Sequence, residues 1–264
     1  MSDSGDTYPT VARYLVTSRW RPMLTEAISV GHAMRLALLS QTPDPVPPVI
    51  SGRGPDNQPL EGHQHLHIFA ESLGEEGRIS HLTVYAPMGF GEAAQQGLEA
   101  VQKIWHHSLD RDLECHLLGR GRPQDFAGSR PEAGHSLALY HDTIWESRTP
   151  FVPTRHGKRR NNGDKKRDED GDWIGGPRHD LKRLLRAAGI DAPTTIETLE
   201  ATKLGGNATT WDAFRTDRDG GGERSTRQGH GFRLTFKYRV CGPIALGYGA
   251  HFGLGRFWPA GRRS

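Results

Sequence analysis

Residues 64–86, QHLHIFAESLGEEGRISHLTVYA, have the pattern of two strands joined by a short turn. Residues 64–70 and 78–86 are rich in β-branched and aromatic side chains, and the segment GEEG between them is typical of a tight connection. We therefore predict a β-hairpin here. The segments on either side of this hairpin decide which fold it belongs to.

The hairpin lies between two predicted helices, which lie between two predicted strands. Residues 11–18 are expected to be a strand, and a helix capped by Thr25 is expected to run to about Leu39. A second helix is predicted over residues 90–105, followed by a strand over 114–121. Its apolar face is expected to comprise Phe90, Ala94, Leu98, Val101 and Trp105. The order βαββαβ is that of a ferredoxin-like domain, which we place at residues 1–130.

A second α+β unit is predicted for residues 131–264, so the expected fold class is α+β with two tandem ferredoxin-like domains. Its predicted elements are a strand over 136–145, a helix over 177–188 that ends at Gly189, a strand over 194–201 and a strand over 231–240. Two long polar loops decorate this unit, over residues 149–176 and 205–230. We expect the Gly-rich insert at 205–230 to be mobile.

The last predicted strand, GFRLTFKYRV at residues 231–240, alternates strictly between apolar and polar side chains. Its polar face is cationic, with Arg233, Lys237 and Arg239. The segment GPIALGYGAHFGLGRF follows, and its closely spaced glycines are Gly247, Gly249, Gly253 and Gly255. Such a loop exposes backbone N–H groups, so a basic strand that leads into it indicates a polyphosphate ligand such as RNA.

This glycine-rich segment matches neither common nucleotide-binding motif. It lacks the Gly-Lys-Ser/Thr ending of a P-loop, and no helix pattern follows it as in a dinucleotide fingerprint. We therefore expect no nucleotide cofactor, and we exclude nucleotide hydrolysis and nicotinamide chemistry. His251 and Arg256 within the segment are predicted to contact RNA together with the four glycines.

Charge is distributed unevenly along the 264 residues. Residues 1–150 hold 12 basic and 18 acidic residues, a net charge of −6, whereas residues 151–264 hold 22 and 13, a net charge of +9. Contact with a polyanion is therefore expected mainly in the second part. The two cysteines are distant in sequence and have no metal-site spacing, which fits a reducing cytoplasm. No apolar run is long enough for a membrane span, and no signal peptide is recognised.

The segment GHQHLHIF places His63, His65 and His67 at alternate positions. On a strand they would share one exposed face, where imidazoles can act as general base and general acid in RNA cleavage. Two other interpretations stay open at this point, a polar face of an edge strand and a metal site. His32, in the first predicted helix, is a weaker candidate because a packed helix histidine is the more common case.

A cluster of basic side chains occupies the first long loop, in TRHGKRRNN. Its members, which we predict to bind phosphates, are Arg155, His156, Lys158, Arg159 and Arg160. The alternative is a solvated charge run, partly offset by the acidic DEDGD that follows. The basic character of this half of the chain favours RNA binding.

These segments resemble a known family. GYGAHFGLG resembles the glycine-rich loop of the RAMP superfamily of CRISPR proteins. Longer stretches resemble successive segments of the type I-U (I-G) processing subunit, namely ARYLVTSRWRPMLTEAISVGHAMRLALLS, SGRGPDNQPLEGHQHLHIF, RISHLTVYAPMGF, TPFVPTRHGKRR and FRLTFKYRVCGPIALGYGAHFGLGRF. The resemblance extends to the endoribonuclease half of that subunit and not to its backbone-capping half. We therefore expect a stand-alone form or a C-terminal fragment.

The resemblance implies an endoribonuclease with two ferredoxin-like domains that cuts CRISPR repeat RNA in precursor crRNA without a metal ion or other cofactor. The ribose 2′-OH attacks the adjacent phosphate, which leaves a 2′,3′-cyclic phosphate and a 5′-OH. The family's HxHxH segment matches His63, His65 and His67. The order of preference for catalysis is His65, His67, His63 and His32, with Tyr85 as a helper.

Three functions remain possible from the sequence. The first is this metal-independent endoribonuclease, acting with other subunits of a type I effector complex. The second is a catalytically silent RNA-binding subunit of such a complex. The third is a metallohydrolase that uses the histidine segment.

Overall fold

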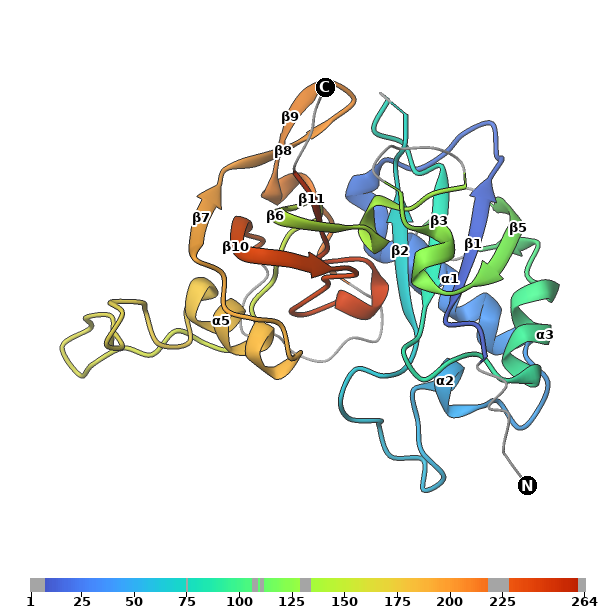
Figure 1. Cartoon of the computed structure of the whole chain (residues 1–264), viewed down its shortest axis with the longest axis horizontal. Coiled ribbons are helices and arrows are strands. Elements are labelled where there is room, and N and C mark those ends of the chain that lie inside the picture. Colours follow the sequence, from blue (N-terminus) through green and yellow to red (C-terminus); the bar gives the residue numbers. More distant parts are fainter. Residues whose placement is uncertain are drawn as a thin grey trace.

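The computed structural model describes residues 8–74, 76–105, 109, 112–128, 134–217 and 228–260. It contains two antiparallel sheets that lie side by side (Figure 1). A separate two-stranded ribbon makes up the third sheet. The expected α+β class with antiparallel sheets is confirmed, whereas the division into domains at residue 130 stays a prediction. No helix among the described residues is long and apolar enough to cross a membrane.

The first sheet has the strand order β2-β3-β1-β5-β4, with every neighbouring pair antiparallel. Without the short β4 at its edge, this is the strand order of the predicted βαββαβ unit. Its elements are β1 (Val11–Val16), η1 (Leu24–Glu26), α1 (Ala27–Gln41), α2 (Pro48–Ser51), β2 (His67–Glu71), β3 (His81–Tyr85), α3 (Glu92–Ala100), β4 (Lys103–Ile104), β5 (Leu113–Gly121) and α4 (Pro123–Phe126).

Three predictions about this half need correction. Helix α1 begins at Ala27, because Leu24–Glu26 form a 3₁₀ turn and Thr25 makes no side-chain cap. Helix α3 ends at Ala100, where the chain turns into β4, so Trp105 is 60% exposed instead of buried. Strand β2 begins only at His67, which leaves His63 and His65 in the preceding turn.

The second sheet has the order β11-β6-β10-β7. In this sheet the strand that comes first in the chain, β6, lies between the third and the fourth, β10 and β11, and the second, β7, lies at the edge next to β10. The strands β1, β2, β3 and β5 of the first sheet are arranged in the same order. Its elements are η2 (Leu137–Leu139), β6 (His141–Ser147), α5 (Pro177–Ala187), β7 (Thr195–Leu199), β8 (Ala201–Leu204), β9 (Asn207–Thr210), η3 (Trp211–Ala213), β10 (Gly231–Cys241), η4 (Ala250–Phe252) and β11 (Phe257–Pro259). Helix α5 occupies the first crossover, and the glycine-rich segment 242–256 replaces a helix in the second.

The second half also departs from the sequence predictions. Residues 137–139 form a 3₁₀ turn, so β6 begins only at His141. The insert predicted to be mobile, residues 205–230, contains β9, which pairs with β8 just before the insert, and Trp211 and Phe214 after β9 are buried. Residues 218–227 lie outside the described part. In β10 the ladder with β6 is irregular between Thr235 and Val240, which leaves Tyr238 66% exposed.

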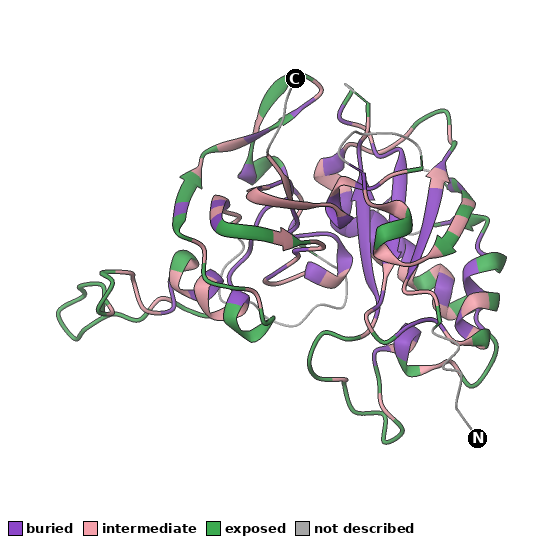
Figure 2. Ribbon diagram, in the orientation of Figure 1, coloured by how far each residue is buried: buried purple, intermediate pink, exposed green. Residues whose placement is uncertain are grey.

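Both faces of the first sheet are covered, and every residue of β2 is therefore buried (Figure 2). On one face, Leu66, Ile68 and Ala70 join the large core with residues of α1 and α3. The opposite face faces the second half, and the glycine-rich segment packs against β2 and α1. A small cluster of Ile28, Val152, Phe252 and Leu254 joins the two halves there.

Candidate functional site

The glycine-rich segment contacts the first half through backbone that lies unusually close to helix α1. A Cβ on Gly31 of α1 would lie 2.5 Å from the Phe252 carbonyl oxygen. Gly253 has φ +93, and a Cβ there would lie 3.2 Å from the Ile68 carbonyl oxygen. Glycine at both positions therefore lets η4 lie between α1 and β2, and this position places His251 next to the start of β2.

Four histidines come together at this contact. The His251 ring stacks on His65 and His67, with ring centroids 4.1 Å and 4.0 Å apart, and the His63 ring is 5.0 Å away. The sequence predicted three histidines on one exposed strand face. In the structure the three lie together, but His63 and His65 belong to a turn and only His67 belongs to a strand. The fourth ring, His251, comes from a distant loop.

A chain of hydrogen bonds fixes the proton positions on two of these rings. His251 Nδ1 lies 2.8 Å from the Leu66 carbonyl oxygen, which can only accept, so Nδ1 carries the proton. In neutral His251, Nε2 is then an acceptor. Because His63 Nδ1 lies 2.8 Å from it, His63 must donate from Nδ1. The remaining nitrogen of neutral His63, Nε2, is therefore an unprotonated base.

The electrostatics of the cluster keep its inner members neutral. Burial, with the neighbouring histidines, lowers the pKa of His251 to about 2. Burial also lowers the pKa of His67 to about 4, and His67 Nε2 donates to the His63 carbonyl oxygen at 3.2 Å. The pKa of His65 is lowered by burial and by Arg35. A neutral His251 is the state that the hydrogen-bond chain requires.

His63 is the exposed member of the cluster. It is one of two non-glycine residues with a left-handed backbone among those described, with φ +54. Such a conformation costs about 1 kcal/mol or more and is frequent at functional sites. It turns the backbone so that the ring reaches His251 while the carbonyl accepts from His67. An accessible imidazole with a fixed tautomer is suited to general base catalysis.

The other predicted catalytic residues lie beside this cluster. His32 is half-buried on α1 and contacts the Phe252 ring edge-on, with centroids 5.8 Å apart. Tyr85 on β3 pairs with His67, with ring centroids 6.3 Å apart, and burial raises its pKa. His67 itself is only 6% exposed. His63, third in the order taken from the sequence, is therefore the histidine best placed to meet a substrate.

The predicted phosphate-binding residues divide into exposed and buried ones. The basic loop residues Arg155, His156, Lys158, Arg159 and Arg160 are all exposed. They begin an irregular arm, residues 155–175, that extends away from both sheets (Figure 1). In this arm Arg159 and Lys165 lie over the ring of Trp173, at 5.4 Å and 4.7 Å from its centroid.

On strand β10, Lys237 and Arg239 are exposed as predicted, and Arg239 reaches His141 at 3.3 Å. Arg233 is half-buried and pairs with Glu146 at 3.1 Å. The Lys237 ammonium lies 5.1 Å from the exposed ring of Tyr238. This end of β10 therefore presents two cations and an aromatic ring, a combination that suits single-stranded RNA.

The structure corrects the prediction for part of the glycine-rich segment. Arg256 is only 3% exposed and lies beside the buried carboxylate of Glu71. The N–H groups of Gly253 and Gly255 donate to the carbonyl oxygens of Ala250 and Pro150. These three residues therefore hold the loop in place and are not available to RNA. Gly247 and Gly249 are half-buried, and both have a left-handed backbone.

Arg256 belongs to a buried charged cluster on the sheet face opposite α1 and α3. Glu71 accepts from Arg13 at 3.0 Å, from Thr83 at 2.5 Å and from Ser136 at 2.8 Å. Burial alone would raise the pKa of Glu71, but Arg13 and Arg256 hold it below its usual value. The cluster fixes the contact between the two halves, and nothing in the sequence pattern predicted it.

The described residues also bear on the metal-site interpretation. The group of side chains that could surround one ion is Asp168, Asp170 and Asp172 in the arm, where Lys182 forms ion pairs with two of them. The four histidines are not such a group, because His251 uses both ring nitrogens in hydrogen bonds and the rings are stacked. The geometry favours proton transfer at the histidine cluster.

Resemblance to known proteins is found in structure and not in sequence. The sequence matches no protein-family model and no curated protein. Among solved structures, the chain is similar to one described as CRISPR associated protein Cas6, with 10% identity and a TM-score of 0.44. The aligned region covers 95% of this chain and 98% of that one.

Proposed function

We propose that this protein is a metal-independent endoribonuclease that cleaves CRISPR repeat RNA within precursor crRNA. The observation that carries this proposal is the hydrogen-bond chain from Leu66 through His251 to the exposed His63. It leaves Nε2 of His63 as an accessible base of defined tautomer. The sequence resemblance to type I-U processing subunits supplies the substrate class.

In the proposed reaction, His63 Nε2 accepts the proton of a ribose 2′-OH. The 2′ oxygen attacks the adjacent phosphorus, and the bond from phosphorus to the 5′ oxygen breaks. His65 and His67 are poor proton donors near neutral pH because their pKa values are lowered. The leaving oxygen therefore takes its proton from water. The products are a 2′,3′-cyclic phosphate and a 5′-OH.

The exposed cations support binding of the same substrate. Lys237 and Arg239 on β10 and the basic side chains at the start of the arm are available for phosphate contacts. Binding through such contacts weakens steeply as the salt concentration rises, because the counterions that binding releases from the RNA then gain less entropy. We further propose that the chain works with other subunits of a type I effector complex.

The test is cleavage of end-labelled repeat RNA by the full chain in excess EDTA. A parallel RNA carries a single 2′-deoxy substitution at the mapped cut. We expect cleavage at one site, a cyclic phosphate end, and no cleavage of the deoxy substrate. Tight binding without cleavage would instead establish the silent RNA-binding subunit. Cleavage that appears only when a divalent ion is restored would establish a metallohydrolase.

A further inference from the structure

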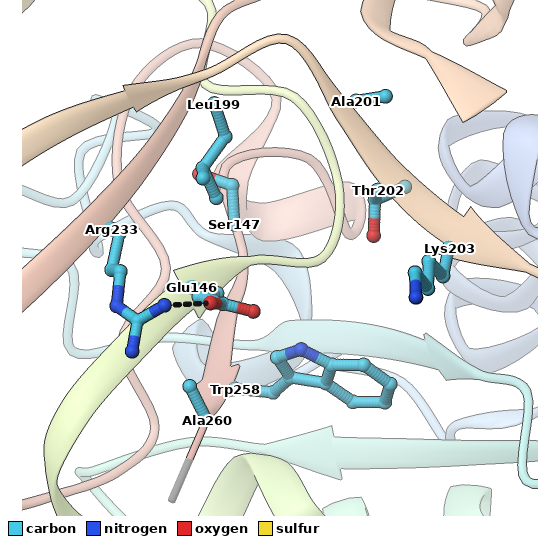
Figure 3. A pocket seen from close by; sticks show the side chains of 9 residues that line it. All are labelled: Glu146, Ser147, Leu199, Ala201, Thr202, Lys203, Arg233, Trp258 and Ala260. Carbon is cyan, nitrogen blue, oxygen red and sulfur yellow. Dashed lines mark hydrogen bonds and ion pairs between the residues drawn. The ribbon is translucent and has the colours of Figure 1, made fainter. Parts of the chain in front are cut away.

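A pocket of about 340 Å³ opens beside the second sheet, away from the histidine cluster. Its walls come from β6, the end of β7, β8, β10 and β11 (Figure 3). The side chains that matter here are those of Glu146, Lys203, Arg233 and Trp258. Its volume lies at the lower end of the range of about 300–1000 Å³ in which proteins bind small ligands.

Trp258 forms a rigid wall of this pocket. The guanidinium of Arg148, itself only 4% exposed, lies 3.8 Å from the centroid of the Trp258 ring. Arg148 is held in turn by the Lys203 carbonyl oxygen. The buried guanidinium of Arg148 therefore helps to hold the indole in place. A fixed and partly exposed indole is a stacking surface for a planar ring.

The polar groups of the pocket combine one acceptor with several donors. Glu146 Oε1 accepts from Arg233 at 3.1 Å, and among the described side chains none donates to Oε2. Figure 3 shows the Glu146 carboxylate near one end of the Trp258 ring and the Lys203 ammonium near the other end. A planar ligand stacked on the indole would therefore meet an anionic acceptor and a cationic donor at its edge.

Guanine matches this pattern better than the other three RNA bases. Its Watson–Crick edge has two adjacent donors, N1–H and the N2 amino group, next to the O6 acceptor. A carboxylate accepts from both donors while a lysine donates to O6. Adenine and cytosine each offer one amino group beside a ring acceptor, and uracil offers a single N–H. A carboxylate is therefore less well satisfied by any of these three.

We propose that this pocket binds an unstacked guanine base of single-stranded RNA and so contributes sequence specificity. Glu146 reads the N1 and N2 donors, Lys203 contacts O6, and Trp258 stacks on the ring. The inference rests on the proposed function for its RNA substrate, but it makes a separate claim about binding. Single-stranded RNA is commonly recognised by splayed bases that stack on aromatic side chains.

The test is fluorescence anisotropy with labelled RNAs of nine nucleotides. Each RNA is oligouridine except for one variable base at its centre. The central base is guanine, adenine, cytosine, uracil or inosine, which is guanine without its N2 amino group. We expect the guanine RNA to bind the full chain about 10-fold more tightly than the others. Glu146→Gln should reduce this preference to less than twofold and should remove the difference between guanine and inosine.

Two further proteins keep this test informative. Lys203→Ala changes an exposed side chain and should lower affinity for the guanine RNA without loss of folding. Glu114→Gln, an exposed glutamate on β5 of the other sheet, is the matched control and should bind as the unmodified protein does. Equal binding of all five RNAs, or a guanine preference that survives in Glu146→Gln, would overturn the proposal.

Free nucleotides separate RNA from a small-molecule ligand. If GMP binds tightly while the five RNAs bind equally, the pocket belongs to a free nucleotide and the RNA assignment is wrong. The experiment is also independent of cleavage. A guanine preference without cleavage in EDTA would contradict the proposed nuclease only, and cleavage without a guanine preference would contradict this inference only.

Discussion

The two sheets have the same order of strands, but their second crossovers differ. In the first sheet, α1 and α3 occupy the two crossovers and cover one face. In the second sheet, α5 occupies the first crossover and the glycine-rich segment takes the place of the second helix. A helix has a diameter of about 10 Å with its side chains, whereas a glycine backbone can approach another backbone directly. The difference allows the second half to place His251 against β2.

The strongest test of this comparison is His63→Ala, which removes the residue that the loop orients. We expect the cleavage rate to fall by about 10²–10⁴, the usual contribution of a general base. Binding of a 2′-deoxy repeat RNA should not change, because His63 lies outside the basic surfaces. The control is His116→Ala, an exposed histidine on β5. Full activity of His63→Ala would place the chemistry elsewhere.

Glu71→Gln tests whether the two halves depend on the buried charged cluster. The change removes the carboxylate that faces Arg13 and Arg256, and the loss of one partner from a buried ion pair typically costs about 3–5 kcal/mol. We expect the free energy of unfolding in urea to fall by this amount. Glu114→Gln, at an exposed position, should leave it unchanged within about 0.5 kcal/mol. A similar loss in both variants would show that the cluster has no special part in stability.

Gly31→Ala tests the close approach of η4 to α1. Gly31 is buried within α1, and alanine has the higher helix propensity by about 1 kcal/mol, so a loss of stability would come from the contact with Phe252. We expect the variant to be less stable by about 1–3 kcal/mol, with a lower cleavage rate as His251 moves. Gly74→Ala serves as the control, because a Cβ there has no atom within 4 Å. A gain in stability for Gly31→Ala would contradict the described packing.

The smallest expected effect is a pH dependence of stability due to His67. Its pKa is about 4 in the folded protein and 6.5 ordinarily, so between these values the unfolded chain binds the additional proton. Its contribution is complete above pH 6.5 and is lost as the pH falls toward 4, by about 1.4 kcal/mol per pH unit. Between pH 7 and 5, the free energy of unfolding in urea should therefore change less steeply with pH for His67→Gln than for the unmodified protein. Identical slopes would show that His67 is not buried as a neutral ring.

The sequence predicted most of the first sheet because each element has its own pattern. Strands over 11–18, 78–86 and 114–121 alternate or are enriched in β-branched residues, and these signals are local. The ribbon β8–β9 was missed because neither strand alternates, although Gly205 and Gly206 between them have the left-handed backbone of a two-residue hairpin. The Gly-Gly pair was the available signal.

The candidate site was predicted in composition but not in geometry. His63, His65 and His67 were recognised from their spacing, yet the turn at His63 places it off the strand. His251 was assigned to RNA, because no local pattern indicates that a residue 188 positions away shares a hydrogen bond with His63. Likewise, nothing in the neighbourhood of Arg256 shows that Glu71 neutralises it. Such pairings arise from the tertiary structure alone.

The separation of His63 and His251 along the chain has a consequence for synthesis in the cell. During translation, the histidine turn leaves the ribosome 188 residues before the loop that holds its Nδ1 proton. A nascent chain with a finished first sheet therefore has an imidazole that is free to rotate and to exchange tautomers. The fixed base exists only after the later loop has docked. The proposed ribonuclease activity therefore depends on a loop that is synthesised after the first sheet.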